Sequence, residues 1–316
     1  MNGKKALVLG ASGGVGGAVA SALLRHGWVV LGMARKVPAT SRDDLAALEW
    51  VVGDALVLED VVAAAKGVDV IVHAVNPAGY RNWDRLVMPM IRNSIAAAKA
   101  NGCARLVLPG TIYNFDPATN PVIDETSPQN ARSRKGRIRA ELEQALKDAS
   151  SEVPVLIVRA GDFFGPGTRS SWFAEAMVAK GKRLRRIINP AKGAGHSWAY
   201  LPDLGETFAQ LFDREDQLKP FEVVHFEGLY DESGNEMTEA IMEAVGRSLP
   251  VWRMPWWLFR VLAPFGGFPR EVAEIIPHWT HPLRLNNRRL LELLGSEPRT
   301  DRQEAVKAAL ADLGCS

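Results

Sequence analysis

Short apolar runs alternate with amphipathic stretches through the first half of the chain, and this alternation predicts strands separated by helices. The expected strands are Lys5–Leu9, Trp28–Met33, Leu48–Val52, Val68–Ala74, Arg105–Leu108 and Val155–Arg159. The expected helices between them are Gly14–His26, Leu58–Lys66, Asp84–Asn101 and Asn130–Ser150. Because apolar strands joined by helices of this length form parallel sheets covered on both faces, the pattern predicts a doubly wound α/β fold of the Rossmann type.

The rhythm changes after residue 160, where proline, glycine and tryptophan become frequent and strands become few. Here the pattern predicts one strand and three helices, at Phe221–Phe226, Met237–Val245, Asn286–Leu294 and Asp301–Leu313. We therefore divide the chain into a sheet domain, residues 1–160, and a smaller, mostly helical cap, residues 161–316, some segments of which return to the sheet.

The composition is that of an ordinary globular protein, with 47% hydrophobic and 23% charged residues among 316. A net charge of +2 implies no polyanion-binding surface, so a nucleic-acid partner is not expected. The two cysteines, Cys103 and Cys315, cannot build a disulfide framework or a cysteine-rich zinc site. They suit a reducing compartment, and we expect a cytoplasmic protein.

The start of the chain imitates a secretory signal, because Lys4 and Lys5 precede the uncharged stretch Ala6–Leu24. Five glycines interrupt that stretch, so we interpret it as a strand, a tight turn and a helix. Other apolar runs are too short to span a bilayer, and no membrane partner is expected.

A glycine-rich turn follows the first strand and opens the first helix. Such a turn needs glycines for its tight bend, for close approach of a pyrophosphate and for contact between helix and strand. Free backbone N–H groups and the helix dipole would then bind the phosphates. The sequence predicts dinucleotide binding by residues 1–160, through Gly10, Ser12, Gly13, Gly14, Val15 and Gly16.

The end of the second strand indicates which dinucleotide is preferred. NAD-binding domains place an acidic residue about 20 residues after the turn, to bind the ribose 2′-hydroxyl. Here the first acidic residue after the turn is Asp43, and the strand ends at Arg35 and Lys36. Two cations suit a 2′-phosphate, so we expect NADP(H) in preference to NAD(H), unless these cations are only a solvated strand end. Asp54, after the third strand, is a candidate for adenine contact or for capping the next helix.

Several further segments resemble the extended short-chain dehydrogenase/reductase superfamily, which includes nucleotide-sugar epimerases and dehydratases. Val70–Ala74 looks like the family's fourth strand, whose end lies against the cofactor, here at Ala74 and Val75. The segment Arg159–Gly167 is similar to the family's Arg-Pro-Gly-Asn-x-Tyr-Gly-Pro motif. Ala199–Leu204 looks like its strand-to-helix junction with a capping Asp, and Leu290–Pro298 resembles its Leu-Gly-x-x-Pro signature.

The chain departs from the family at the proton donor. Family enzymes carry a Ser or Thr after the fifth strand, then Tyr-x-x-x-Lys on the following helix. Thr111 matches the hydroxyl, but Lys135 occupies the tyrosine position and Arg139 the lysine position. Tyr113 is a second candidate acid or base, and in extended chain it would point to the same side as Thr111.

These four residues support a mechanistic hypothesis and an alternative. Thr111 would orient a substrate oxygen, Lys135 or Tyr113 would move the proton, and the guanidinium of Arg139 would bind ribose hydroxyls. Burial and a neighbouring cation would adapt Lys135 to that task. In the alternative, the many cations between residues 132 and 139 form a solvated basic helix without chemistry.

We therefore expect an NAD(P)-dependent oxidoreductase or epimerase/dehydratase-like enzyme that acts on a small molecule bound by the cap. Two alternatives remain open: an NADP(H)-binding redox sensor or assembly factor without turnover, and a sugar-nucleotide epimerase with retained NAD. The resemblance implies a homodimer packed through the helices Asp84–Asn101 and Asn130–Ser150. The substrate cannot be read from the sequence.

The histidines and a late aromatic cluster give weaker signals. No metal site is expected, and His73 and His196 are expected to pack or to form local hydrogen bonds, although His196 belongs to a segment that faces the family's substrate cleft. The aromatic cluster admits three interpretations, namely the core of the cap, an apolar substrate pocket or a membrane-surface patch, of which we expect the first. Its members are Trp252, Trp256, Trp257, Phe259, Phe265 and Phe268.

Overall fold

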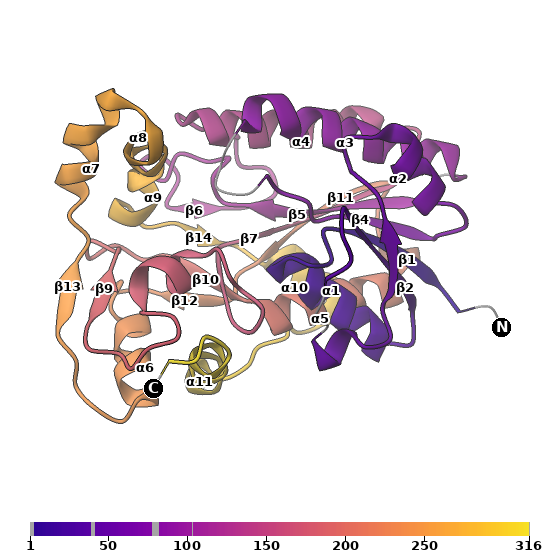
Figure 1. Cartoon of the computed structure of the whole chain (residues 1–316). Coiled ribbons are helices and arrows are strands. Elements are labelled where there is room, and N and C mark those ends of the chain that lie inside the picture. The colour runs from indigo at the N-terminus through magenta and orange to yellow at the C-terminus, as the bar shows by residue number, and fades with distance from the viewer. Residues whose placement is uncertain (1–2, 39–41, 78–81, 103, 316) are drawn as a thin grey trace.

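The computed structural model describes residues 3–38, 42–77, 82–102 and 104–315, and its centre is a seven-stranded parallel sheet (Figure 1). The strands are β1 (Lys5–Leu9), β2 (Val29–Ala34), β3 (Glu49–Val52), β4 (Val70–His73), β5 (Arg105–Thr111), β7 (Val155–Ala160) and β11 (Phe221–Phe226). Their order across the sheet is β11-β7-β5-β4-β1-β2-β3, and every pair is parallel. The predicted doubly wound fold is confirmed.

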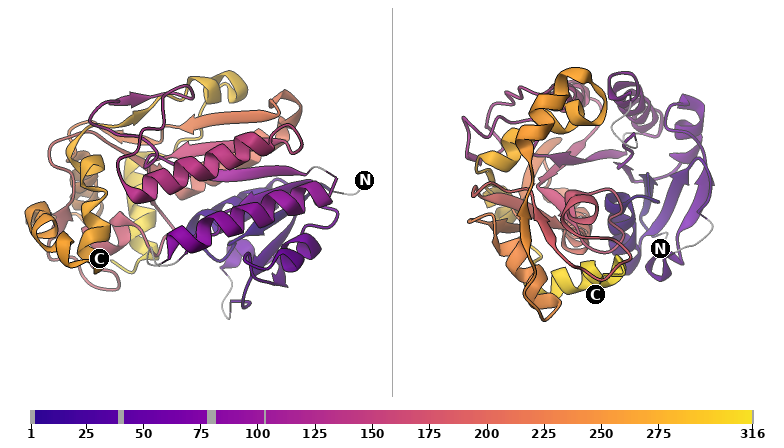
Figure 2. Two further views of the ribbon diagram at one scale, coloured as in Figure 1. Left: turned by 90° about the horizontal axis from the view of Figure 1, so that it is seen from above. Right: turned by 60° about the vertical axis from the view of Figure 1, so that its left-hand side comes forward.

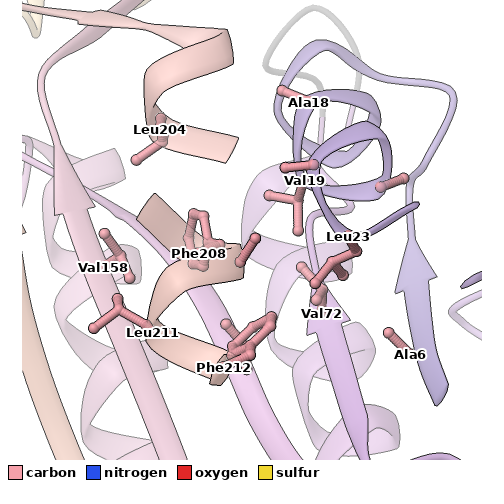
Figure 3. Packing of buried hydrophobic residues seen from close by; sticks show 14 of the residues in the cluster. Ala6, Ala18, Val19, Leu23, Val72, Val158, Leu204, Phe208, Leu211 and Phe212 are labelled. Atoms are coloured by element: carbon pink, nitrogen blue, oxygen red, sulfur yellow. The ribbon is translucent and has the colours of Figure 1, made fainter. Parts of the chain in front are cut away.

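Helices cover both faces of this sheet because its strands alternate their side chains between two apolar cores. Ala6 and Val8 face one core, and Leu7 and Leu9 face the other. The first face is covered by α1 (Gly14–Arg25), α5 (Leu201–Asp213) and α10 (Arg288–Leu294), and the second by α2 (Leu58–Ala64), α3 (Trp83–Ala100) and α4 (Arg134–Ala149) (Figure 1). Figure 3 shows the first core, where Leu23 and Phe212 fill the space between α1, α5 and the sheet.

The C-terminal half, joined by the short strand at residues 122–123, adds a cap of small sheets and short helices at one end of the central sheet (Figure 2). Its sheets are formed by β8 (Asp162–Phe164), β10 (His196–Tyr200) and β12 (Leu229–Asp231), by β9 (Ile187–Asn189) and β13 (Val251–Arg253), and by β6 (Val122–Ile123) and β14 (Arg284–Leu285). Its helices are α6 (Glu236–Ala244), α7 (Trp256–Leu262), α8 (Gly267–Ala273), α9 (Ile276–Thr280) and α11 (Arg302–Asp312).

Two elements near the site differ from the predicted bounds. β5 continues to Thr111 because Gly110 tolerates the close neighbouring strand, where a Cβ atom would lie 2.8 Å from the Cγ atom of Arg159. α4 begins only at Arg134, because the Ser133 hydroxyl caps it by accepting the Gly136 N–H at 3.0 Å. Asn130 was predicted to begin this helix, but it lies before the helix and its side chain accepts the Asp116 N–H at 2.9 Å.

The expected capping role of Asp203 is wrong. No side chain caps α5, and Pro202 in its first turn lacks an N–H group that would need an acceptor. The Asp203 carboxylate instead accepts the N–H and the hydroxyl of Thr300, at 2.7 and 2.6 Å. It therefore ties α5 to the chain that leads into α11.

The core interpretation of the aromatic cluster is wrong for most of its members. Trp256 is buried and Phe259 is half-buried, but the side chains of Trp252, Trp257, Phe265 and Phe268 are exposed. The reason is that α7 and α8 pack on the cap through one face only.

Candidate functional site

The glycine-rich turn between β1 and α1 has the geometry expected of a phosphate-binding turn. Gly10 has a φ of 86°, and a Cβ atom there would lie 2.8 Å from the Ala74 carbonyl oxygen. A Cβ atom on Gly16 would lie only 2.3 Å from the Gly10 carbonyl oxygen. The turn thus needs glycine at both positions, and Ser12 and Gly13 stay exposed beside half-buried Gly14 and Val15 at the start of α1. This open cradle fits a dinucleotide pyrophosphate.

The sheet order places this turn at a topological switch point. β4 and β2 lie on opposite sides of β1, so the crossover helices leave in different directions at the carboxyl ends of β1 and β4. Ala74 donates its N–H to the Leu9 carbonyl at 3.0 Å, which draws the segment after β4 against the turn. Ala74, Val75 and Asn76 therefore line the crevice in which doubly wound folds bind ligands.

Cations gather at the β2 edge of this crevice. Arg35 and Lys36 follow β2 and are exposed, and within the described part of the chain neither forms an ion pair. Sequence reasoning missed a third cation, Arg42, because only folding brings it near the turn. Its guanidinium pairs with Asp44 and lies 3.4 Å from the Cβ position of Gly17 in α1.

The expected alternative role of Asp54, capping the next helix, is wrong, because the residue orders the turn before that helix. Its carboxylate accepts the Leu56 N–H at 3.0 Å, and its carbonyl accepts the Val57 N–H at 2.9 Å. These bonds order the turn before α2 rather than cap the helix itself, whose N-cap is Val57. The adenine contact stays a prediction.

Tyr113 differs from its expected position. β5 ends at Thr111 and the chain turns at once, so the extended geometry expected between Thr111 and Tyr113 is wrong. The Thr111 hydroxyl accepts the Tyr113 N–H at 3.3 Å, and this bond stabilises the turn. The Tyr113 hydroxyl then donates to the Asp162 carboxylate at 2.7 Å.

Asp162 continues this contact into a hydrogen-bonded chain inside the cap. Its second carboxylate oxygen lies 2.8 Å from Nε2 of His196, and Nδ1 of His196 lies 3.2 Å from the His278 carbonyl. The His196 ring stacks on Trp279 at 3.8 Å between centroids, which fixes its plane. His196 forms the expected local bonds, but they link it to Tyr113 through Asp162.

His278 forms the wall behind Tyr113. Its ring meets the Tyr113 ring edge-on at 4.9 Å, and its Nε2 atom lies 3.2 Å from the Phe115 carbonyl. Burial lowers the pKa of His278 to about 4, so the imidazole is neutral at pH 7. Because the His278 ring is neutral, it does not form an ion pair with Asp162, whose carboxylate instead contacts Tyr113 and His196.

Arg139 and Lys135 share a face of α4 but serve different parts of the molecule. Arg139 donates to the Asn76 side chain at 3.2 Å and lies 4.8 Å above the Trp83 ring. It therefore stands at the crevice beside the end of β4. Lys135 is buried, and its ammonium contacts the Glu271 carboxylate at 2.6 Å and the Glu271 carbonyl at 2.9 Å.

The Lys135 contacts change the interpretation of that residue. The sequence suggested a neighbouring cation that would adapt Lys135 to proton transfer, but the structure pairs its side chain with the Glu271 carboxylate. The Glu274 carboxylate also accepts the Lys135 N–H at 3.3 Å. Lys135 therefore joins α4 to α8, and the expectation of a solvated basic helix is wrong at this position.

A buried ion pair fixes the loop that carries Tyr113. Arg159 on β7 contacts the Glu143 carboxylate on α4 at 2.7 Å, and both side chains are 4% exposed. Asn114 and Gln129 donate to the same carboxylate at 2.8 and 2.7 Å. Because Asn114 follows Tyr113 directly, this network anchors the chain next to Tyr113.

Metal binding and membrane insertion are the next two properties of the described residues. Within the described ranges, no group of three or more His, Cys, Asp or Glu side chains is arranged to hold a metal ion. None of the described helices combines the length and apolar character needed to cross a bilayer. Cys103 lies outside the described residues, and the cytoplasmic location stays a prediction.

Comparison with known proteins agrees with this geometry. Residues 10–176 match the model of a family described as NAD(P)H-binding. A curated relative from Streptomyces sp., 3-diazoavenalumate denitrifying reductase, is 30% identical over 181 residues, which are 52% of this chain and 58% of the relative. The chain thus matches little more than half the length of that relative.

Solved structures share the fold over almost their whole length. UDP-glucose 4-epimerase from Bifidobacterium longum, in complex with NAD+ and UDP, superposes with a TM-score of 0.78 at 13% identity. The Bordetella bronchiseptica enzyme WbmH, in complex with NAD+, superposes with a TM-score of 0.71 at 20% identity. Each match covers 98% of both chains. The chain therefore shares the fold of these two NAD-binding enzymes.

Proposed function

This chain belongs to the NAD(P)H-binding family, and from that premise we propose that it is an NADP(H)-dependent oxidoreductase acting on a small carbonyl or hydroxyl compound. The observation that carries the proposal is the pairing of a phosphate cradle, Gly10 to Gly16, with a hydrogen-bonded tyrosine, Tyr113, beyond the end of β5. The curated relative is named as a reductase, which favours reduction over epimerisation for this chain.

The preference for NADP(H) rests on charge at the end of β2. Arg35 and Lys36 are exposed there, and the stretch between the turn and Asp43 contains no acid that would accept the ribose 2′-hydroxyl. Two cations beside a 2′-phosphate form charge-assisted hydrogen bonds, each worth about 1.5–3 kcal/mol. The same cations contribute little to the binding free energy of a 2′-hydroxyl, because that group carries no charge.

The proton is handled by Tyr113 together with the chain behind it. The cofactor supplies or accepts the hydride when it is bound. Tyr113 exchanges a proton with the substrate oxygen, while its bond to Asp162 holds the phenol in place and connects it to His196.

The other three predicted catalytic residues take supporting roles in this proposal. Thr111 positions the substrate oxygen and the turn that carries Tyr113. Arg139, beside Asn76, binds the ribose hydroxyls next to the nicotinamide. Lys135 positions α8 through Glu271 instead of moving a proton.

Cofactor titration tests the first half of the proposal. We expect NADPH to bind at least about tenfold more tightly than NADH, and we expect Arg35→Ser/Lys36→Ser to remove that difference while NADH binding stays unchanged. Equal affinities in the unaltered protein would contradict the preference. Absence of binding by any nicotinamide nucleotide would contradict the function.

Turnover tests the second half. In a screen of NADPH oxidation with aldehydes, ketones and nucleotide sugars, Tyr113→Phe should lower kcat by about 10²–10⁴-fold with cofactor affinity unchanged. Tyr230→Phe, in β12, is the matched control and should retain activity. Tight cofactor binding without turnover on any substrate would support the sensor alternative.

The homodimer stays a prediction. α3 and α4 lie side by side on the outer face of the sheet (Figure 2), and a hollow of about 590 Å³ lies between them. Sedimentation velocity of the unaltered protein would measure its mass directly, and a monomer would remove this prediction.

A further inference from the structure

The exposed apolar side chains of this protein concentrate on one feature, the hairpin formed by β13, α7 and α8. Fifteen large hydrophobic side chains are exposed in the described part of the chain, and eight of them lie between residues 251 and 268. The four exposed aromatic side chains among them are Trp252, Trp257, Phe265 and Phe268, of which Phe265 is 86% exposed. A patch of this kind on a folded protein marks an interaction site.

The hairpin is firmly anchored, so its open face is part of the native fold. Trp256 is buried, donates its indole N–H to the Pro190 carbonyl at 2.8 Å and packs against Trp172. Val272 of α8 is buried in the same core, and Glu271 receives Lys135 from α4. Figure 1 shows α7 and α8 together at the end of the molecule remote from the N-terminus.

The exposed residues of α7 form a stripe along one side of the helix. Trp257 and Val261 are four residues apart, as are Leu258 and Leu262, so the two pairs share a face. Phe265 and Phe268 extend the stripe through the turn into α8. Exposed apolar side chains thus follow one another along α7, the turn after it and the start of α8.

Two stretches of chain at this surface carry many cations and no acids, although Glu271 and Glu274 follow directly after the second of them. Residues 176–202 and 244–270 contain no Asp or Glu, and β9 and β13 join these two stretches in parallel register. The guanidinium of Arg186 lies 4.4 Å above the Trp252 ring. The cations of the two stretches are Lys180, Lys182, Arg183, Arg185, Arg186, Lys192, Arg247, Arg253, Arg260 and Arg270.

This charge is strongly local. The two stretches carry ten cations, whereas the whole chain has a net charge of +2, so the remaining residues are net negative. Exposed aromatic and aliphatic side chains flanked by arginine and lysine are typical of helices that lie in the interface of a membrane with anionic lipids. We propose that the α7–α8 hairpin docks this protein peripherally on a membrane surface that contains anionic phospholipid.

The charge also decides against a second copy of the chain as occupant. A two-fold contact through this hairpin would bring the same basic residues of both copies, among them Arg185, Arg186 and Arg260, to one interface. Like charges would then face one another across an apolar contact without carboxylates from these stretches to pair them. An anionic lipid surface supplies both the apolar interior and the opposite charge. This proposal takes up the membrane-surface interpretation of the aromatic cluster, although the sequence led us to expect no membrane partner.

Vesicle co-sedimentation with the full chain tests the proposal. We expect binding to vesicles of phosphatidylcholine mixed with phosphatidylglycerol, weaker binding to phosphatidylcholine alone, and release as salt is raised. Trp257→Ser/Phe265→Ser should lower the partition coefficient by about a hundredfold, because each inserted aromatic contributes about tenfold or more. Arg185→Glu/Arg186→Glu should lower binding to the anionic vesicles selectively.

Val52→Ser is the matched control, because it removes another highly exposed apolar side chain, on β3 of the sheet domain, and should leave vesicle binding unchanged. Cofactor titration of each variant reports whether the protein is still folded, independently of the vesicles. Failure of the unaltered protein to bind anionic vesicles would overturn the proposal. A change from dimer to monomer in Trp257→Ser/Phe265→Ser, without vesicle binding by the unaltered protein, would assign the surface to a second copy.

Discussion

Replacing Gly16 by alanine tests the geometry of the cofactor cradle. The added Cβ atom would lie 2.3 Å from the Gly10 carbonyl oxygen and 2.8 Å from its carbonyl carbon. Atoms of folded proteins do not approach so closely, so α1 and the turn must separate by about 1 Å to reach ordinary contact. The buried residues Val19 and Leu23 of α1 oppose that movement, because they are packed between the sheet and α5.

The magnitude follows from two opposing terms. Alanine is favoured over glycine in a helix by about 1 kcal/mol, whereas overpacking a well-filled contact costs about 1–3 kcal/mol. We expect the free energy of unfolding to fall by up to about 2 kcal/mol. A shift of the turn also misaligns the N–H groups that bind phosphate. Losing one charge-assisted bond of about 1.5–3 kcal/mol weakens NADPH binding by roughly 10–150-fold.

Gly17→Ala is the matched control, because it lies one residue further along the same helix and brings the same helix propensity. Its Cβ atom would lie 3.2 Å from the Ala11 carbonyl oxygen, so a shift of a few tenths of an ångström relieves the contact. Isothermal titration with NADPH and urea denaturation should show Gly17→Ala close to the unaltered protein. Equal affinities of the Gly16→Ala and Gly17→Ala proteins for NADPH would refute the reasoning.

Three further perturbations examine the buried polar groups. Arg159→Met leaves the buried Glu143 carboxylate without its ion-pair partner and should lower the free energy of unfolding, measured in urea, by about 3–5 kcal/mol. The double variant Arg159→Met/Glu143→Leu should restore most of this loss. If Arg159→Met alone is as stable as the unaltered protein, the pair has no structural role. Thr300→Val removes the hydroxyl that donates to the Asp203 carboxylate, and the free energy of unfolding at pH 7 should fall by about 1.5–3 kcal/mol. Burial raises the pKa of Asp203, so this loss of stability should shrink as acid protonates the carboxyl. A loss of stability that does not change with pH would contradict this account. Burial lowers the pKa of three histidines well below 6.5, so their contribution to stability is complete above that value and is lost as pH falls, by up to about 4 kcal/mol per pH unit. Thermal unfolding between about pH 7 and pH 4 should show this slope, and a flat profile would mean that these histidines are accessible to protons. Their pKa values are about 3 for His73, about 3 for His225 and about 4 for His278.

The sheet and the cofactor cradle could be predicted because their signals are local. The apolar period of each strand and helix is set by residues within one element, and β1 has the predicted bounds of Lys5–Leu9. The glycines of the turn could be recognised in the sequence for the same reason. Gly10 has a positive φ, and Gly16 lies in close contact with Gly10, so both positions require glycine.

The cap was harder to predict because its elements are short and obey no long period. α5 and the β8–β10–β12 sheet were not delimited from the sequence, and the hairpin of α7 and α8 looked like core because it is so rich in aromatic residues. An apolar residue at helical spacing shows that one face is apolar. It does not show whether another part of the chain covers that face.

The sequence by itself determined a doubly wound domain with a dinucleotide cradle, and it placed Thr111 and Tyr113 just beyond the fifth strand. Only the tertiary structure decided what these side chains contact. Tyr113 meets Asp162, 49 residues away, and Asp162 meets His196, a further 34 residues away, while Lys135 meets Glu271 instead of a substrate. The physical reason is that periodicity and turn chemistry depend on neighbours along the chain. The partners of a buried polar group, and the cover of an apolar face, depend on how distant segments pack.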